Sequence, residues 1–208
     1  MTQANNTRRR IVAATGAALG LSSFTGRALG KGQLRPTPVQ EEGPFYPVSF
    51  SGDVDYDLLT TGALHYSQGQ PTWLSGVVTD PDGAPVKGAM IEIWQADQHG
   101  HYHHPRDRGG ADPAFQGFAR IAVDASGQYR FHTIRPVPYT GRTPHIHFRI
   151  KLGPRELLTT QLYVAGDPGN PGDFIWSSLS EQDRAAVTRP FERGPDGMMA
   201  RFPIVVEA

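Results

Sequence analysis

The sequence of 208 residues contains no cysteine. Without thiols the chain cannot form disulfide bonds, bind a metal through thiolate sulfur or use a cysteine nucleophile. Any metal site must therefore be built from His, Tyr, Asp or Glu side chains.

The sequence also lacks an excess of charge of either sign. Lys and Arg together number 20, Asp and Glu also number 20, and no basic stripe occurs beyond the extreme N-terminus. Because clustered cations dominate nucleic-acid affinity, a nucleic-acid partner is not expected. The hydrophobic fraction of 38% is nevertheless sufficient for one globular domain with its own core.

The apolar stretch near the N-terminus is too short to span a bilayer stably. It runs from Ile11 to about Phe24, is rich in Gly and Ala, and follows three arginines at positions 8–10. This layout is typical of a secretory signal, and the paired arginines resemble a twin-arginine export signal. We therefore expect a signal peptide over residues 1–30 and a periplasmic or extracellular mature protein. The alternative, an amphipathic first helix, is disfavoured because no polar face interrupts the stretch.

Glycine and proline are abundant, with 24 and 18 residues. Together with short β-branched and aromatic runs, they favour short strands joined by tight turns. Residues 31–66, rich in Pro, Gly and acidic side chains, predict an extended arm, and residues 67–208 predict the strands. We expect one all-β domain over residues 31–208, an immunoglobulin-like or prealbumin-like β-sandwich with long loops and a short C-terminal helix.

Six or seven short strands with turn signals between them are predicted. Residues 80–85 and 124–127 combine Asp with Gly, Pro or Ser and mark turns between two pairs of strands. A short helix is expected to begin at Ser180, where Asp183 completes a weak capping box. The predicted strands are Trp73–Thr79, Ala89–Trp94, Ile121–Val123, Tyr129–Phe131, His145–Lys151, Thr159–Val164 and Phe202–Val206.

One predicted strand places two histidines on the same face. Because side chains alternate along a strand, His145, His147 and Arg149 share one side, while Ile146 and Phe148 share the other. The two imidazoles are then about 7 Å apart at their Cα atoms and can converge on one metal ion. The alternative is a solvated polar face, since Arg149 continues the same side.

A metal held by these histidines requires further ligands. Without cysteine, tyrosine phenolates become candidates, because iron and similar ions accept imidazole nitrogen together with anionic oxygen. Tyr102 and Tyr139 are available, although a tyrosine judged by itself is more often a core or interface residue. Residue types and spacing alone leave this choice open.

Short motifs follow one another along the chain in a specific order. They are Gly76–Asp80, Gly83–Val86, Ile91–Asp97, Gly100–Tyr102, Gly127–Ile134, Pro138–Tyr139, Arg142–Phe148 and Thr160–Tyr163. Each is weak by itself, but the ordered set resembles the intradiol ring-cleavage dioxygenases of the protocatechuate 3,4-dioxygenase type. The match runs from about Glu42 to the final strand, and the His-x-His strand preceded by Pro-Tyr is its strongest part.

The resemblance implies a catalytic domain with a mononuclear, non-haem iron(III) site. The implied ligands, two phenolates and two imidazoles, are Tyr102 (equatorial), Tyr139 (axial), His145 (equatorial) and His147 (axial). Arg142 matches the active-site arginine of the family, and Gln161 matches its active-site glutamine.

The resemblance also implies the reaction. A catechol-type substrate would be cleaved by O2, with both oxygen atoms incorporated, to a cis,cis-muconate-type acid. Tyr139 would act as a base toward the substrate, Arg142 would stabilise carbanion character on the ring, and Gln161 would help to position it.

Two features depart from the family pattern. Only residues 140–144 separate Tyr139 from His145, fewer than in protocatechuate enzymes, which leaves the pocket wall and the identity of the catechol open. The chain also shows no match to the long helical N-terminal region of catechol 1,2-dioxygenases. The dimer which that region makes is therefore not assumed, and a homo-oligomer is left open.

Other residues in these motifs have ordinary structural interpretations. The histidines at positions 99, 101, 103 and 104 lie in a loop of Gly, Arg and Asp, which favours solvated or hydrogen-bonding roles. We expect Trp94 and Tyr129 to pack in the core, Glu92 to be exposed or ion-paired, and Tyr46 to line the pocket.

A different class of function is a prealbumin-like binding module, because Gly76–Ala89 also resembles the generic hairpin of carbohydrate-binding or peptidase-associated β-sandwiches. That interpretation gives no role to Tyr102, Tyr139 or Arg142. A third interpretation keeps the fold and the iron without turnover. Consumption of catechol and O2 distinguishes an enzyme from both.

Overall fold

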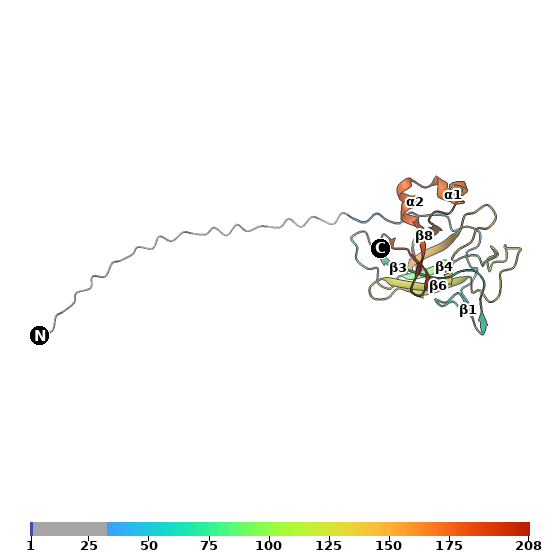
Figure 1. The fold of residues 1–208 in the computed structure, drawn as a ribbon, viewed down its shortest axis with the longest axis horizontal. Coiled ribbons are helices and arrows are strands. Elements are labelled where there is room, and N and C mark those ends of the chain that lie inside the picture. Colours follow the sequence, from blue (N-terminus) through green and yellow to red (C-terminus); the bar gives the residue numbers. More distant parts are fainter. Residues whose placement is uncertain (2–32) are drawn as a thin grey trace. The chain divides into compact units, whose positions relative to one another are not determined.

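The computed structural model describes Met1 and residues 33–208. The export signal predicted over residues 1–30 lies outside the described residues, apart from Met1. Residues 33–208 form a sandwich of two five-stranded sheets that share one hydrophobic core (Figure 1). This confirms the predicted all-β class.

The first sheet has the order β10-β11-β3-β12, with β6 also paired to β3, and the second has the order β5-β4-β7-β8-β9. The larger strands pair in antiparallel fashion within the second sheet, whereas β11 and β12 pair parallel to β3. The strands are β1 (Thr60–Thr61), β2 (Leu64–His65), β3 (Pro71–Thr79), β4 (Met90–Trp94), β5 (Phe118–Ala122), β6 (Gln128–Ile134), β7 (His145–Leu152), β8 (Arg155–Val164), β9 (Thr188–Arg189), β10 (Phe191–Gly194), β11 (Gly197–Arg201) and β12 (Ile204–Val205).

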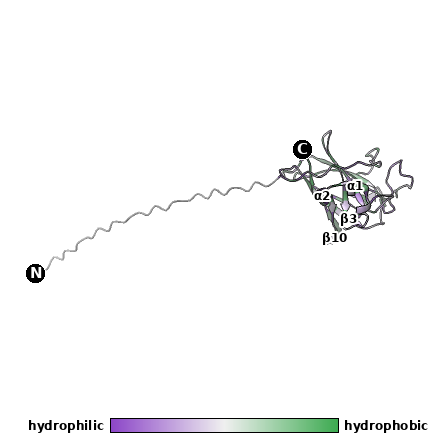
Figure 2. Ribbon diagram, turned by 90° about the horizontal axis from the view of Figure 1, so that it is seen from above, coloured by the Kyte–Doolittle hydropathy of each residue, from purple (hydrophilic) through white to green (hydrophobic). Residues whose placement is uncertain are grey.

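Strand β7 lies at the centre of the second sheet, between β4 and β8. Its residues Ile146, Phe148 and Ile150 are fully buried and face the first sheet, where the Phe148 ring lies 5.1 Å from that of Phe202. The alternate residues of β7 therefore face away from this core, as the period of two predicts. Figure 2 shows hydrophobic stretches of strand within the body of the domain.

All seven predicted strands are confirmed in part or in full, but their ends and neighbours differ. The strand predicted over residues 202–206 is reduced to β12, and β8 begins at Arg155 rather than at Thr159. Strands β1, β2, β9, β10 and β11 were not predicted, and β1 and β2 lie within residues 31–66, where an extended arm was predicted. Strand β11 contains the sequence Gly-Met-Met-Ala-Arg, which does not alternate, and it is stabilised by pairing with β3, more than a hundred residues earlier.

Two short helices follow β8 and lie together on one side of the sandwich (Figure 1). Helix α2 (Glu181–Val187) confirms the predicted helix start at Ser180, whose Oγ accepts from the amide of Asp183. The reciprocal half of the capping box differs, because the Asp183 carboxylate accepts from the Ser180 hydroxyl rather than from its amide. Helix α1 (Phe174–Ser178) was not predicted; it follows the 3₁₀ turn η1 (Asn170–Gly172) and is capped by Asp173. None of the described helices has the length and hydrophobicity needed to cross a membrane.

The N-terminal segment of the described chain lies along the domain as an arm, which we define as residues 33–50. The amide of Thr37 donates to Val205 O and the amide of Gln40 donates to Thr159 O, each at 2.9 Å. The arm thereby contacts strands of both sheets. Its later part reaches the outward face of the second sheet, where the polar residues of β7 lie.

Candidate functional site

The two histidines of β7 are buried on the outward face of the second sheet. His145 and His147 are 2% and 1% exposed, so a solvated polar face is wrong for this pair. His145 Nδ1 lies 2.7 Å from Thr143 O, which can only accept, and therefore carries the proton. The unprotonated Nε2 of neutral His145 then faces His147 Nε2 at 3.1 Å.

Both imidazoles are held in the neutral form that binds metals. Burial, followed by the nearby Arg142 cation, lowers the pKa of His145 to about 3. Burial, followed by His145 and Arg142, also lowers the pKa of His147 well below its ordinary value. Because neutral imidazoles have nitrogen lone pairs, they can act as metal ligands.

Strand register fixes the orientation of His147. Trp94 lies opposite His147 in the β4–β7 ladder, and their rings stack at 4.7 Å with an interplanar angle of 8°. Trp94 is 1% exposed, which confirms the expectation that it packs in the core. It belongs to a separate cluster with Ala96 and Tyr102, against which Phe45 packs.

Tyr102 is placed by the long loop between β4 and β5. Asp97 accepts from the amide of His101 at 3.0 Å, and Asp107 accepts from the amide of Tyr102 at 2.6 Å. These two carboxylates tie the loop on either side of Tyr102, whose side chain is buried with a residue exposure of 3%. Burial, followed by the neighbouring Tyr139, raises the pKa of Tyr102 well above its ordinary value.

Tyr139 lies in the loop between β6 and β7 and is only partly buried. The amide of Arg142 donates to Tyr139 O at 2.8 Å, which closes a tight turn around Gly141, whose φ of 78° suits a glycine. The Tyr139 ring lies 5.3 Å from Tyr102 and 5.4 Å from His145. With the 4.7 Å His145–His147 and 6.1 Å Tyr102–His147 ring distances, the four side chains form one closed cluster.

This four-ring cluster, defined as Tyr102, Tyr139, His145 and His147, fits a metal ion. Among the described residues, no group of three or more His, Asp or Glu side chains is placed to hold a metal, so a metal at this cluster would use tyrosine oxygens beside the two imidazoles. The Tyr102 hydroxyl is buried without a hydrogen-bond partner among the described residues, and His147 Nδ1 is likewise unpartnered. Because a buried polar group rarely lacks a partner, the Tyr102 oxygen and the facing Nε2 atoms are donors that a metal ion would fit.

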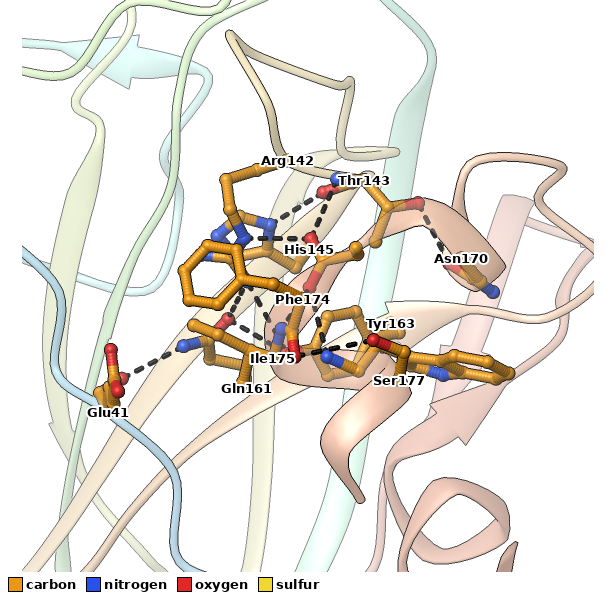
Figure 3. Close-up of polar contacts among 12 residues, drawn as sticks. Glu41, Arg142, Thr143, His145, Gln161, Tyr163, Asn170, Phe174, Ile175 and Ser177 are labelled. Atoms are coloured by element: carbon orange, nitrogen blue, oxygen red, sulfur yellow. Dashed lines mark hydrogen bonds and ion pairs between the residues drawn. The ribbon is translucent and has the colours of Figure 1, made fainter. Parts of the chain in front are cut away.

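Arg142 and Gln161 form a polar network beside the cluster (Figure 3). Arg142 Nη2 donates to Gln161 Oε1 at 2.6 Å, and Gln161 Nε2 donates to Glu41 O at 2.9 Å. The Gln161 side-chain amide therefore accepts from Arg142 through its oxygen and donates to the arm through its nitrogen. The Tyr163 hydroxyl extends the network by donating to Gln40 Oε1 at 2.8 Å.

The arm covers the outward face of β7. The Phe45 ring stacks on Tyr102 at 4.8 Å, and the Arg149 guanidinium pairs with Glu42 and lies 4.0 Å from the Tyr46 ring. Gly43, between them, has a φ of 74°, and a Cβ there would lie 3.4 Å from His147 Cε1. The arm thus approaches His147 through a residue without a side chain.

Two surface cavities meet at Tyr139. One, of about 610 Å³, is lined by residues that include Tyr139, Arg142 and Asp173. The other, of about 440 Å³, is lined by residues that include Tyr139, Phe45 and Arg108. Both volumes lie in the usual range for small-molecule sites, and Tyr139 is the side chain that both cavities share.

The chain matches a protein family over most of its length. A family model described as Dioxygenase matches residues 41–208. The protocatechuate 3,4-dioxygenase beta chain of Burkholderia cepacia is 36% identical over 181 residues, which cover 77% of this chain and 76% of that one. The chain belongs to the intradiol ring-cleavage dioxygenase family.

Other dioxygenases are also similar to this chain in sequence and in structure. Hydroxyquinol 1,2-dioxygenase of Rhodococcus opacus is 36% identical over 172 residues, covering 71% of this chain and 53% of the relative, so this dioxygenase spans about half of that protein. The dioxygenase domain of a carbohydrate-binding fusion protein from Streptomyces sp. SirexAA-E has a TM-score of 0.67 and 29% identity. The structural alignment covers 84% of this chain and 99% of that domain.

The structure of the dioxygenase brings all six predicted site residues together, four in the cluster and two in the network. Glu92 is fully buried and ion-paired with Arg120 at 2.7 Å, which confirms the second of the two expected environments. Tyr46 donates to Glu92 at 2.7 Å and packs on Trp94, whereas it is Phe45 that lines the cavity beside Tyr139.

The remaining expectations concern histidines of the loop and Tyr129. His101 lies 3.2 Å from the Asp107 carboxylate and His103 lies 2.5 Å from Phe115 O, in agreement with hydrogen-bonding roles. Tyr129 is buried in the core of the dioxygenase and donates to Phe202 O at 2.5 Å.

Sequence reasoning missed Asp173 and the arm residue Phe45. An Asp directly before a helical turn is a common N-cap, so the segment Gly-Asp-Phe at Asp173 carried a readable signal. Phe45 carried none, because its contact with Tyr102 depends on how the arm folds back on the sheet.

Replacement of Gly43 tests the close approach of the arm to His147. Gly43→Ala places a methyl group against His147 Cε1 and also strains a positive φ, which costs about 1–2 kcal/mol of stability. Gly52→Ala is the matched control, because Gly52 has a φ of 80° and no atom within 4 Å of an added Cβ. We expect similar urea midpoints but a shifted His147 Cε1–H NMR signal only in Gly43→Ala. An unchanged His147 signal would contradict the contact.

Proposed function

We propose that this dioxygenase cleaves a catechol-type aromatic ring between its two hydroxyl-bearing carbons, using O2 and a mononuclear iron(III), to give a cis,cis-muconate-type product. The observation that carries this proposal is the buried cluster of two neutral imidazoles and two phenols beside Arg142. Two relatives are named as dioxygenases of protocatechuate and of hydroxyquinol, and these names support the same class of substrate.

The four-ring cluster would hold the iron. Tyr102 and Tyr139 would provide phenolate oxygens, and His145 and His147 would provide Nε2 nitrogens. Iron(III), when bound, supplies the positive charge that lowers phenol pKa values and withdraws electrons from the catechol ring. Burial raises the pKa of both tyrosines and so disfavours their phenolate forms. The positive charge of a bound iron would offset this effect.

The two tyrosines differ in ways that suit different roles. Tyr102 is buried and fixed by Asp97 and Asp107 through its loop, so its oxygen would remain in place. Tyr139 is partly exposed, lies in a short turn and borders both cavities. We assign to the Tyr139 oxygen the role of the base that accepts a proton from the entering catechol.

Arg142 supplies a fixed positive charge next to Tyr139. Burial has the largest effect on the pKa of Tyr139 and raises it. The nearby Arg142 cation has the next largest effect and lowers this pKa. The same charge is suited to stabilising negative charge that develops on the ring. Gln161 contributes by holding Arg142 through its Oε1 atom.

The identity of the catechol depends on the walls around Tyr139. Residues 141–144 of the short link line the larger cavity, and protocatechuate, catechol, hydroxyquinol and larger aryl catechols are the substrates to compare. The oxygen-uptake rates with a panel of these compounds define the preference.

Oxygen uptake tests the reaction directly. We expect iron-loaded protein to be red-brown from phenolate-to-iron charge transfer and to consume one O2 for each catechol, with absorbance from a muconate-type product. A chelator that removes the iron should abolish both the colour and the uptake. Iron-loaded, coloured protein that consumes no member of the panel would support a fold without turnover, and colourless protein would support a binding module.

Replacement of Tyr139 tests its role as the base. Tyr139→Phe should retain iron through the other three ligands but slow anaerobic catechol binding by roughly 10²-fold, because a general base contributes at least that much. Tyr56→Phe is the control, since Tyr56 is 49% exposed and stacks on Trp73, away from the cluster. Stopped-flow absorbance measures the binding. Catechol binding at the wild-type rate in Tyr139→Phe would show that the assignment is wrong.

We further propose that the protein is exported by the twin-arginine pathway, on the basis of the arginines at positions 8–10 and the apolar stretch that follows. Arg8→Lys combined with Arg9→Lys removes every adjacent arginine pair and should retain the protein in the cytoplasm. Arg10→Lys keeps one pair and serves as the control. Cell fractionation measures the outcome, and export of the double variant at the normal level would contradict the proposal.

A further inference from the structure

The buried carboxylate of Asp173 joins helix α1 to the arginine of the site. Its Oδ1 atom accepts from the amides of Ile175 and Trp176, each at 3.0 Å. Its Oδ2 atom accepts from Arg142 Nε at 2.7 Å and from the amide of Thr143 at 3.0 Å. One carboxylate, 0% exposed, therefore binds the first turn of α1 and the loop that carries Arg142.

Arg142 is held at two of its three guanidinium nitrogens. Nε donates to Asp173, and Nη2 donates to Gln161 Oε1 at 2.6 Å. The Arg142 side chain is 8% exposed, and its guanidinium carbon lies 5.5 Å from the Phe174 ring. Two bonds in the plane of a rigid guanidinium fix both its position and its orientation.

We propose that Asp173 is a positioning residue of the reaction, which sets the orientation of the Arg142 guanidinium toward the ring-cleavage site. This rests on the proposed function, in which Arg142 stabilises negative charge on the substrate. The carboxylate is itself fixed by two backbone amides of α1, so the orientation of Arg142 is set by the helix. Displacement of such a charge by about 1 Å can reduce the rate roughly 10²-fold.

A purely structural role for Asp173 is the competing explanation, because Asp173 is also the N-cap of α1. The two roles use different oxygens and can be separated. In Asp173→Asn, the Oδ1 acceptor toward Ile175 and Trp176 is retained, and Asn caps helices as well as Asp does. The Nδ2 group, however, would face two donors, Arg142 Nε and the amide of Thr143, so the arginine contact is lost.

The first test compares steady-state kinetics of full-length, iron-loaded variants. We expect Asp173→Asn to lower kcat by about 10- to 100-fold with KM within about threefold, because the contact acts on charge that develops in the transition state. Ser180→Ala, which removes the equivalent cap of α2, should lower the thermal midpoint while changing kcat by less than about twofold. Wild-type kcat in Asp173→Asn would overturn the positioning role.

The second test does not depend on turnover. Asp173→Asn and Arg142→Lys are combined in a double-mutant cycle that is measured by urea unfolding. If Asp173 binds Arg142 Nε, the urea midpoint shift of the double variant is smaller than the sum of the single shifts, because Lys has no Nε donor in that position. Additive midpoint shifts would overturn the contact on which the proposal rests.

The outcomes also separate this proposal from the proposed function. Wild-type protein that consumes catechol, with an Asp173→Asn variant of equal kcat, overturns the positioning role and leaves the function standing. Wild-type protein that consumes no catechol overturns the function, and with it the positioning role, even where the unfolding cycle shows coupling.

Discussion

The alternation of side chains along β7 couples the hydrophobic core to the polar site. Ile146 and Phe148 point into the sandwich, and this fixes His145 and His147 on the opposite face. A shift of one residue in register would exchange the two sets and place imidazoles in the core. Because β7 is paired on both sides, with Trp94 opposite His147 on β4 and Gln161 opposite it on β8, such a shift would disrupt both ladders.

The remaining parts of the site are loops and an arm attached to this strand. The loops contribute Tyr102, whose amide donates to the Asp107 carboxylate, and Tyr139, whose carbonyl accepts from the amide of Arg142. The arm covers the polar face of β7 and contacts Gln161 through a backbone carbonyl. Burial keeps the imidazoles neutral, and the Arg142 side chain is only 8% exposed, which strengthens the effect of its charge.

The parts of this site that the sequence predicted are those with a periodic or local signal. The strand over His145 and His147 follows from alternation, and the helix at Ser180 follows from its cap. Tyr102 was assigned only through the order of family motifs, because its position depends on loop hydrogen bonds to Asp97 and Asp107. The pairing of β11 with β3 joins segments distant in sequence, and no local pattern indicates such a contact.

Anomalous X-ray diffraction from crystals of the iron-loaded protein, collected at the iron edge, shows directly whether the four-ring cluster holds the iron. We expect one strong peak about 2 Å from each of four atoms, the hydroxyl oxygens of Tyr102 and Tyr139 and the Nε2 atoms of His145 and His147. A peak at other side chains, or iron-loaded crystals without a peak at this cluster, would contradict this expectation.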